Sequence, residues 1–447
     1  MTFAWTVAPA LVPQERTNRW WPPFRLLPLI AIVLLLTAPV ETPGAGATGR
    51  VTPADVASVV AVAFCVGYAV HRRARPLTPA AAAVLGIPAV GFAVATVTAA
   101  DPAAALPGFV RYLQVFVLVP AAVVFLVRDA RDFRIVTWCV VALALFQGAT
   151  GVYQYVTGTG ASYMGADVRA VGTFGPSDVM GMATVVAYGL LAAIALTLRT
   201  PANPPPWLRP CALAAAAALV VPLVLSFSRG AWIATAVAAL AVILLTGLRQ
   251  AVRALAVLAA VAVILVGGLG IGSEMISQRL TSITQVTDAP DRSVNDRYMM
   301  WAAAARMWRE EPATGVGLKG FPAHRDGHAS IGLSSGSDTA GAGQTFQKQP
   351  LLSPHNMYLL VLSEQGLIGL TTFVGSLAAV LLVGLRRLTH SRGRATDCGL
   401  VAVGLMIWQT VDFLYADIGG ASTVLTGVVL GLAAWWALAE PDEAVTP

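Results

Sequence analysis

Two residues of the sequence combine a chemically useful side chain with a position at the end of an apolar segment. His355 stands in the run SPHNMY, where a long polar stretch gives way to apolar residues. Imidazole titrates near neutral pH, so a histidine here can act as a general base, although a helix-capping role is the simpler alternative. Arg229 stands in the run FSRGAW between two apolar segments, where Ser228 can cap a helix and Gly230 permits a tight turn. A cation in so short a connection favours anion binding.

Three further charged residues lie inside or beside apolar segments. Arg111 in GFVRYLQVF and Asp412 in WQTVDFLYAD fall within apolar runs, where an ionised side chain costs about 2.5–3.5 kcal/mol at the bilayer centre. Arg111 either extends to the headgroups or faces a hydrophilic cavity, and Asp412 either pairs with a buried arginine or supports catalysis. Arg169 in RAVGTFGPSD belongs to a Gly-rich loop, where it is either an anion ligand or a solvated charge.

The composition shows what kind of scaffold must position these residues. Hydrophobic residues make up 57% of the 447, charged residues only 12%, and the mean hydropathy is +0.71. Soluble domains carry roughly 25% charged residues, so this chain cannot cover a globular surface. The same numbers exclude disorder and a nucleic-acid-binding scaffold. We predict an all-α, polytopic integral membrane protein with the bilayer as its environment and no nucleic-acid partner.

Twelve segments fit the length of a transmembrane helix, which needs roughly 20 mostly apolar residues. The first is short, and a cleaved signal peptide is the alternative for it. The predicted spans are 25–41, 54–71, 79–99, 105–127, 133–155, 177–198, 207–226, 230–247, 251–271, 362–385, 396–415 and 420–438.

Arginine residues in the short loops predict the orientation, because cytoplasmic loops carry the excess of positive charge. The N-terminal segment and every second loop after it hold 17 arginines, whereas the alternate short loops hold only Arg50, Arg169 and Arg229. Both termini are therefore predicted to be cytoplasmic.

One connection, residues 272–354, is an 83-residue polar loop that this topology places on the extracytoplasmic face. The predicted organisation is thus helices 1–9 in 1–271, a loop domain in 272–354, and helices 10–12 with a short cytoplasmic tail in 355–447. Within the loop, 293–310 is predicted to form an amphipathic helix, and the Gly/Ser/Gln-rich 322–350 a flexible flap. The predicted apolar stripe of that helix is Tyr298, Trp301, Ala305 and Trp308.

Nucleotide-binding, metal-binding and serine-nucleophile motifs are not evident in the sequence. His324 and His328 are four residues apart, but no nearby carboxylate or cysteine completes a zinc set. We therefore predict neither a metal nor another cofactor.

Four stretches, taken together and in order, resemble the O-antigen ligase/polymerase superfamily of bacterial membrane glycosyltransferases, the WaaL-like and Wzy-like proteins. One departure is Pro176-Ser177-Asp178, where many relatives have a Pro-Asn pair, and residues 327–350 match nothing in the family. The four stretches are RAVGTFGPSDVMG at 169–181, SFSRGAW at 226–232, RYMMWAAAARMWREEPATGVGLKGF at 297–321 and PHNMYLLVLSEQGLIGL at 354–370.

The resemblance implies transfer of a glycan from a polyprenyl-pyrophosphate carrier to an acceptor hydroxyl of a lipid or another glycan, on the outer face of the bacterial inner membrane. It further implies that His355 is the base and that Arg229 and Arg297 hold the pyrophosphate. Arg169 or Arg111 is expected to help them. Arginine suits bidentate contacts to phosphate, so we expect a metal-independent, inverting displacement.

Two supporting residues and two other functions stay open. Glu364 is either a partner of His355 or a charge favoured by a helix N-terminus, and Asp412 is the second supporting candidate. A polymerase uses the same donor as a ligase, so these motifs do not separate the two activities. A transporter would use Arg111 and Asp412 as parts of a solute path, but it would leave the large loop and its histidine without a role.

Overall fold

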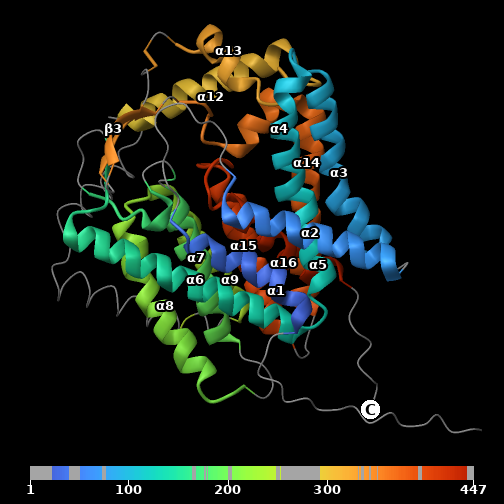
Figure 1. Cartoon of the computed structure of the whole chain (residues 1–447), viewed down its shortest axis with the longest axis vertical. Helices are drawn as coiled ribbons and strands as arrows, with labels where there is room; N and C mark the ends of the chain where they lie inside the picture. The colour runs from blue at the N-terminus through green and yellow to red at the C-terminus, as the bar shows by residue number, and fades with distance from the viewer. Residues whose placement is uncertain are drawn as a thin grey trace, which may run out of the picture.

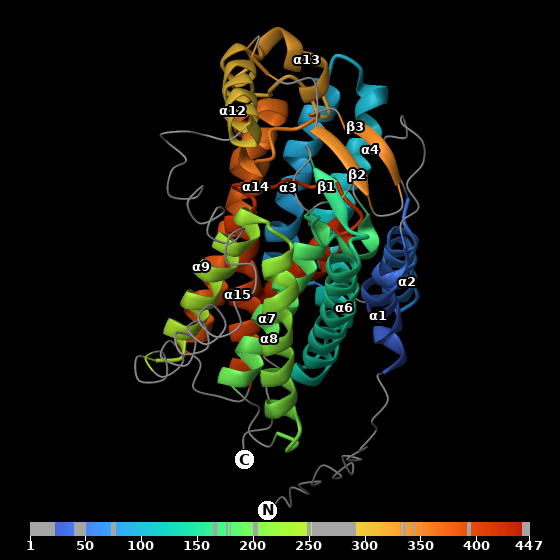
Figure 2. The same ribbon diagram turned by 90° about the vertical axis from the view of Figure 1, so that its left-hand side faces the viewer.

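The structure is a computed structural model of the whole chain, and almost all of its ordered elements are helices (Figure 1). One end of the molecule carries the short helices and strands of the long loop, and the helical body lies below it (Figures 1 and 2). The residues that the structure describes are 23–39, 51–72, 77–163, 168–175, 178, 180–199, 204–247, 252, 292–330, 332–333, 337–341, 344–349, 351–390 and 395–439.

The helices of the body follow the apolar segments of the sequence closely. In chain order they are the 3₁₀ turn η1 (Phe24–Leu26), α1 (Leu27–Leu34), η2 (Leu35–Thr37), α2 (Pro53–Arg72), α3 (Pro79–Val97), α4 (Pro102–Leu113), the π-helical η3 (Gln114–Leu118), α5 (Val119–Leu126), α6 (Ala130–Thr157), η4 (Gly172–Phe174), α7 (Gly181–Leu198), α8 (Leu208–Leu225), α9 (Arg229–Leu245), α14 (Met357–His390), α15 (Thr396–Asp412) and α16 (Thr423–Leu438).

Helices occupy eleven of the twelve predicted spans, and the remaining one, 251–271, lies outside the described residues except for 252. Seven described helices are both long and apolar enough to cross a membrane. The total of twelve spans therefore stays a prediction, while a helical membrane protein is what the structure shows. The seven are Pro53–His71, Pro79–Val97, Pro102–Leu126, Ala130–Thr157, Gly181–Leu198, Leu208–Leu225 and Met357–His390.

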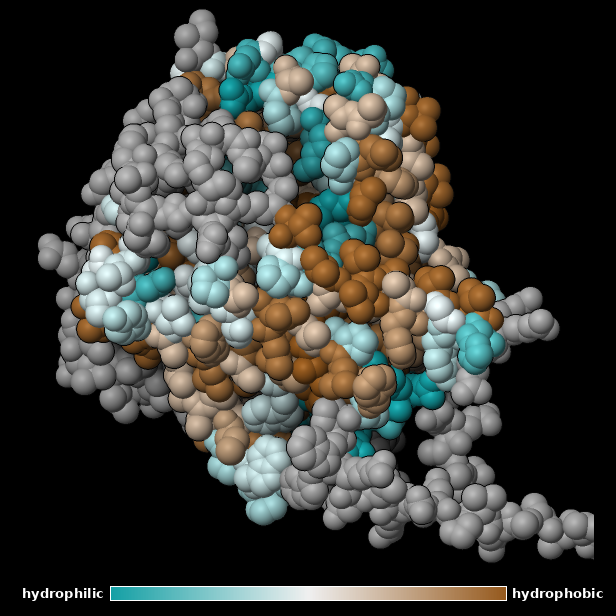
Figure 3. Space-filling view, viewed as in Figure 1, coloured by the Kyte–Doolittle hydropathy of each residue, from teal (hydrophilic) through white to brown (hydrophobic). Residues whose placement is uncertain are grey.

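Helix α7 lies at the centre of one half of the body. Nearly all of its side chains are buried, and it packs against α6, α8, α9 and α15. A helix that is apolar on every side belongs in such a position. Other helices turn apolar side chains outward: hydrophobic residues gather over the helical body and hydrophilic ones over the end that carries the loop helices (Figure 3). An apolar outer surface of this kind suits contact with lipid.

The loop contains two helices, α12 (Arg292–Glu310) and α13 (Phe321–His328), and two strands, β2 (Ser337–Gly341) and β3 (Gln344–Gln349). Strand β2 pairs antiparallel with both β3 and β1 (Ala161–Tyr163), which follows α6. The prediction of a flexible flap over 322–350 is therefore wrong, since much of that segment is ordered as helix and sheet. Backbone pairing with Ala161–Tyr163, which is distant in the sequence, supplies this order, and local composition does not reveal it.

The amphipathic helix predicted over 293–310 is confirmed as α12, but its predicted apolar stripe is wrong. Tyr298 is 42% exposed. The run MMWAAAARMW contains two stripes with helical spacing, and periodicity alone cannot choose between them. The buried stripe consists of Met300, Ala303, Ala304 and Met307.

Helix α14 is broken at Gly366, whose φ of +61° is accessible to glycine. The segment after α12 fills the break: Leu367 N–H donates to the Pro312 carbonyl at 2.9 Å, and Val316 N–H donates to the Ser363 carbonyl at 2.9 Å. Non-helical backbone at membrane depth is tolerated only where protein or water satisfies it. The loop domain is thereby joined to a membrane-spanning helix by main-chain hydrogen bonds.

Candidate active site

His355 lies directly before α14 in a strained backbone conformation, with φ of +48°. A positive φ is uncommon for a residue other than glycine, and such strain is often found at functional sites. Two neighbours fix it: the Asn356 side chain caps the helix by accepting from Leu359 N–H at 3.0 Å, and Met357 N–H donates to the Phe413 carbonyl at 2.8 Å. The residue as a whole is half-buried.

Helix α12 reaches the other side of His355. The Trp301 indole N–H donates to the Pro354 carbonyl at 2.9 Å. Arg297 lies one helical turn before Trp301 and so on the same side of the helix. Its charge acts both on His355 and on the carboxylate of Asp412, which is buried at the end of α15.

The surroundings of His355 favour its neutral form. Burial lowers its pKa below the usual 6.5, the negative charge of Asp417 partly opposes this, and the positive charge of Arg297 lowers the pKa further. A neutral imidazole at physiological pH is able to accept a proton. The lowered pKa therefore favours the proton-accepting form of His355.

Arg229 is the first residue of α9, and the local sequence explains its position. Ser228 caps the helix by accepting from Ala231 N–H at 3.4 Å, and Phe227 turns the chain with φ of +48°. Gly230 packs closely on Tyr415, because a Cβ at this glycine would lie 3.0 Å from the tyrosine Cβ. The arginine is thus placed at a helix N-terminus, where anions are favoured.

The first stretch, 169–181, packs against the second, 226–232. The Ala170 N–H donates to the carbonyl of Leu225 at 3.2 Å, and the Ser228 hydroxyl donates to the Met180 sulfur at 3.2 Å. Arg169 itself is fixed by two main-chain hydrogen bonds with Ala161, at 2.8 and 3.0 Å. The residues before Gly172 are therefore held next to the loop that presents Arg229.

Two glutamines of α6 order the turn that follows Arg169, and neither was selected by the sequence analysis. Gln154 accepts from Gly172 N–H at 2.9 Å and donates to its carbonyl at 2.9 Å. Gln147 accepts from Thr173 N–H at 3.0 Å. The one feature that could have indicated their role is their position in a long apolar helix, because a buried side-chain amide needs hydrogen-bond partners.

The connection between α15 and α16, residues 413–422, joins these parts. It accepts hydrogen bonds from Met357 N–H and from the Asn356 side chain, which donates to the Leu414 carbonyl at 3.1 Å. It touches the second stretch through Tyr415, and it carries Asp417, whose charge acts on His355. We call residues 413–422 the C-terminal loop. Sequence reasoning did not select it, apart from the neighbouring Asp412.

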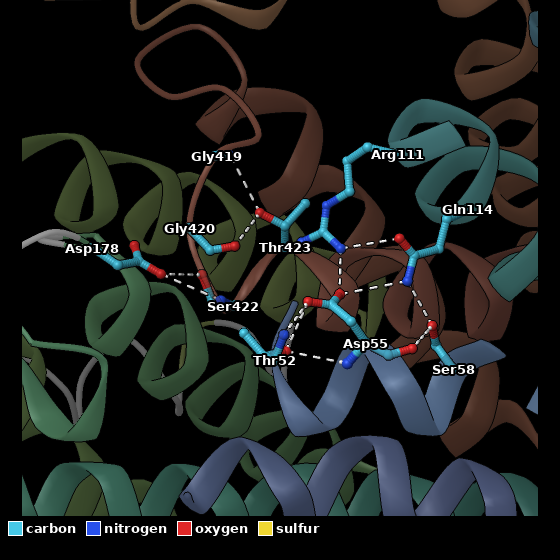
Figure 4. Close-up of polar contacts among 10 residues, drawn as sticks. All are labelled: Thr52, Asp55, Ser58, Arg111, Gln114, Asp178, Gly419, Gly420, Ser422 and Thr423. Carbon is cyan, nitrogen blue, oxygen red and sulfur yellow. Dashed lines mark hydrogen bonds and ion pairs between the residues drawn. The ribbon is translucent and has the colours of Figure 1, made fainter. Parts of the chain in front are cut away.

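Arg111 lies in a different environment. Its guanidinium forms an ion pair with Asp55 of α2 and donates to the side-chain oxygen Oε1 of Gln114 at 3.0 Å (Figure 4). Gln114 in turn donates to Ser58 at 2.6 Å and begins the π-helical segment η3. The partner of Arg111 is therefore Asp55, so Arg111 is not the buried arginine expected to pair with Asp412.

Glu364 is buried at the break in α14 and accepts from Phe321 N–H at 3.2 Å, at the start of α13. The carboxylate thus holds α13 to the transmembrane helix. Its second oxygen, Oε2, makes no hydrogen bond with the part of the chain that the structure describes. This hydrogen bond joins Glu364 to α13, so the partnership of Glu364 with His355 stays a prediction.

The residues described above are a histidine with a lowered pKa, one arginine on each of α9 and α12, and buried carboxylates. Guanidinium groups bind phosphate oxygens with charge-assisted hydrogen bonds, and a histidine in their vicinity can remove a proton from a hydroxyl. Among the described residues, no group of three or more His, Cys, Asp or Glu side chains could hold a metal ion. Residues of these types can bind an anionic group and accept a proton.

The sequence comparison agrees with the order of the motifs. Residues 214–374 match the O-antigen ligase family. This region contains three of the four stretches, whereas the first stretch and the C-terminal loop lie outside it. No curated protein matches the chain convincingly. This match, which covers about a third of the chain, supports the resemblance to the O-antigen ligase/polymerase superfamily.

Proposed function

We propose that this protein transfers a glycan from a polyprenyl-pyrophosphate donor to a hydroxyl group of a lipid or glycan acceptor. The reaction takes place at the extracytoplasmic face of the bacterial inner membrane, with both termini in the cytoplasm. The observation that carries the proposal is the convergence of all four motif stretches on His355 and the C-terminal loop. A donor outside the cell must be lipid-linked, because nucleotide sugars are cytoplasmic.

Arg229 and Arg297 bind the pyrophosphate in this proposal. Arg229 adds its charge to the N-terminus of α9, and Arg297 approaches His355 from α12. Arg169, whose loop packs beside that of Arg229, supports them. Arg111 has a weaker claim, because its charge is already balanced by Asp55.

His355 acts as the base in a single displacement. Its unprotonated ring nitrogen accepts the proton of the acceptor hydroxyl while that oxygen forms a bond to the anomeric carbon. The bond from this carbon to the pyrophosphate oxygen breaks, and polyprenyl pyrophosphate leaves with the electron pair. Attack opposite the leaving group inverts the anomeric centre. The two arginines stabilise the negative charge that develops on the pyrophosphate, so the reaction needs no metal ion.

The carboxylates support this machinery. Asp417 stabilises the imidazolium that forms when His355 takes up the proton, since its negative charge already raises the affinity of His355 for a proton. Asp412 lies within the influence of Arg297 and helps to orient it. Glu364 holds the loop domain in place through the start of α13.

We favour a ligase, which moves a finished glycan, because the matched family is described as O-antigen ligase. A polymerase adds the growing glycan to the next lipid-linked repeat and uses the same donor. The two activities differ in which intermediate accumulates when the enzyme fails.

Mass spectrometry of polyprenyl-pyrophosphate glycans tests the proposal in cells that carry the wild-type protein or His355→Ala. The matched control is His390→Ala, because His390 is exposed at the far end of α14. A ligase predicts long lipid-linked polymers only in the His355 variant, and a polymerase predicts single repeats. An unchanged pool at normal protein level would contradict the transfer reaction and favour transport instead.

A further inference from the structure

A carboxylate in the first stretch connects it with the C-terminal loop. Asp178 Oδ2 accepts from the Ser422 N–H at 3.2 Å and from the Ser422 hydroxyl at 3.1 Å (Figure 4). The two residues are 244 positions apart in the chain. Asp178 lies three residues before α7, and Ser422 is the N-cap residue of α16. One carboxylate therefore links the starts of two helices.

The space around this carboxylate is shaped by glycines. A Cβ at Gly420 would lie 2.0 Å from Asp178 Oδ2, and a Cβ at Gly181 would lie 2.6 Å from the same oxygen. Contacts this short do not occur in proteins, so each glycine is needed for the carboxylate to sit where it does. The two glycines come from the two segments that Asp178 connects, because Gly181 is the first residue of α7 and Gly420 belongs to the C-terminal loop.

The Asp178 carboxylate is affected both by burial and by hydrogen bonds from its neighbours. Burial raises its pKa above the usual value, while hydrogen bonds from Ser422 and from the main chain at Gly181 and Ala421 act in the opposite direction. A buried carboxylate with several main-chain donors is well suited to fix a loop. Helix N-termini also favour a negative charge.

The C-terminal loop carries this restraint to His355. Its turn is closed internally, since the Thr423 hydroxyl donates to the Gly420 carbonyl at 2.7 Å and accepts from Gly419 N–H at 3.2 Å. At its other end, the Ala416 carbonyl accepts from Met357 N–H at 3.1 Å. Asp417 lies between these two points. A shift of the turn at Ser422 would therefore move both the main-chain support of His355 and the carboxylate that acts on it.

We propose that Asp178 is a positioning residue that sets the location of His355 and Asp417 by holding the C-terminal loop through Ser422. It contacts neither the substrate nor the reacting atoms. The inference rests on the proposed transfer reaction and adds to it a residue from the Pro176-Ser177-Asp178 run, where the chain departs from many of its relatives.

The test compares Asp178→Ala with Asp178→Asn in the purified, reconstituted full-length protein, using a lipid-linked glycan donor and its acceptor. Asparagine keeps a side-chain oxygen that accepts both bonds from Ser422, whereas alanine removes it. We expect Asp178→Ala to lower kcat about 30-fold or more, since small misplacements of catalytic groups are costly. The KM for the donor should stay nearly constant, and Asp178→Asn should restore most of the loss.

A double-mutant cycle with Gly420→Ala identifies the contact itself. In the wild-type background the added methyl group collides with the Asp178 carboxylate and should reduce kcat. In the Asp178→Ala background the collision is absent, so the second substitution should add little further loss. Independent, additive losses would overturn the proposal.

His355→Ala serves as the reference that separates the two hypotheses. If the His355→Ala protein retains full transfer activity, the proposed function fails, irrespective of the result for the Asp178 variants. If it abolishes transfer while Asp178→Ala keeps wild-type kcat, the positioning role is overturned and the function stands. A merely structural role of Asp178 is shown by a lower yield and melting temperature with unchanged kcat per folded molecule, and this too overturns the proposal.

Discussion

The indole N–H of Trp301 donates to the carbonyl oxygen of Pro354 at 2.9 Å, and so the loop helix α12 holds the residue that precedes His355. The contact joins two of the motif stretches directly. Arg297 lies one turn earlier on the same helix, so any shift of α12 would move the arginine and the base together. The loop domain and the transmembrane body thus both contribute to the candidate site.

Trp301→Phe should reduce transfer activity about fivefold, since a neutral hydrogen bond contributes about 1 kcal/mol. Phenylalanine keeps most of the packing but cannot donate to Pro354. Trp308→Phe is the matched control, because the Trp308 indole N–H is buried without a hydrogen-bond partner in the described part of the chain. Initial rates of the purified variants measure the effect, and an equal loss in both variants would contradict it.

Arg297→Ala should lower the transfer rate about 100-fold, as expected when a donor to a developing negative charge is removed. Arg297→Lys should recover only part of this, because lysine lacks the bidentate geometry. Arg309→Ala on the exposed side of the same helix is the control. Steady-state kinetics with a lipid-linked donor measure these effects, and a normal rate for Arg297→Ala would remove this residue from the pyrophosphate site.

The pH dependence of transfer should report the titration of His355. Its lowered pKa predicts that activity rises with pH, is half-maximal below pH 6.5 and is constant around neutrality. Asp417→Asn removes a negative charge that raises this pKa, so the rising limb should move to lower pH. Rates measured from pH 5 to 8 test the shift. A movement to higher pH would show that Asp417 does not act on the base.

Arg111→Ala should affect stability more than catalysis. Loss of the partner leaves the Asp55 carboxylate uncompensated, which should lower the unfolding free energy by about 1–3 kcal/mol, because the arginine is still partly exposed. Asp55→Asn combined with Arg111→Met should recover part of the loss. Thermal unfolding in detergent and the rate per folded molecule separate the two effects. A large fall in rate with unchanged stability would support a pyrophosphate-binding role for Arg111.

Much of the fold follows from the sequence because lipid imposes strong local rules. Apolar length predicted helices at eleven of twelve ranges, and the amphipathic pattern predicted α12. The face that α12 buries was not predictable, since Trp301 and Met300 belong to overlapping stripes in an apolar run. The strands β2 and β3 were missed because their order depends on pairing with Ala161–Tyr163.

The candidate site was only partly predictable for a related reason. His355 and Arg229 were selected from the sequence because a histidine or an arginine is unusual at the end of an apolar segment. Asp178 and Ser422 did not, since their contact spans 244 residues. Asp55 was missed as the partner of Arg111, since nothing in the sequence relates a residue near the start of α2 to one in α4.

The most direct test of the central claim is release of polyprenyl pyrophosphate by the purified protein in the presence of a lipid-linked glycan and an acceptor. We predict a single turnover that couples this release to glycan transfer in the wild type and in His390→Ala, with both products lost in His355→Ala. Coupled transfer at the wild-type rate by the correctly folded His355→Ala protein would contradict the account.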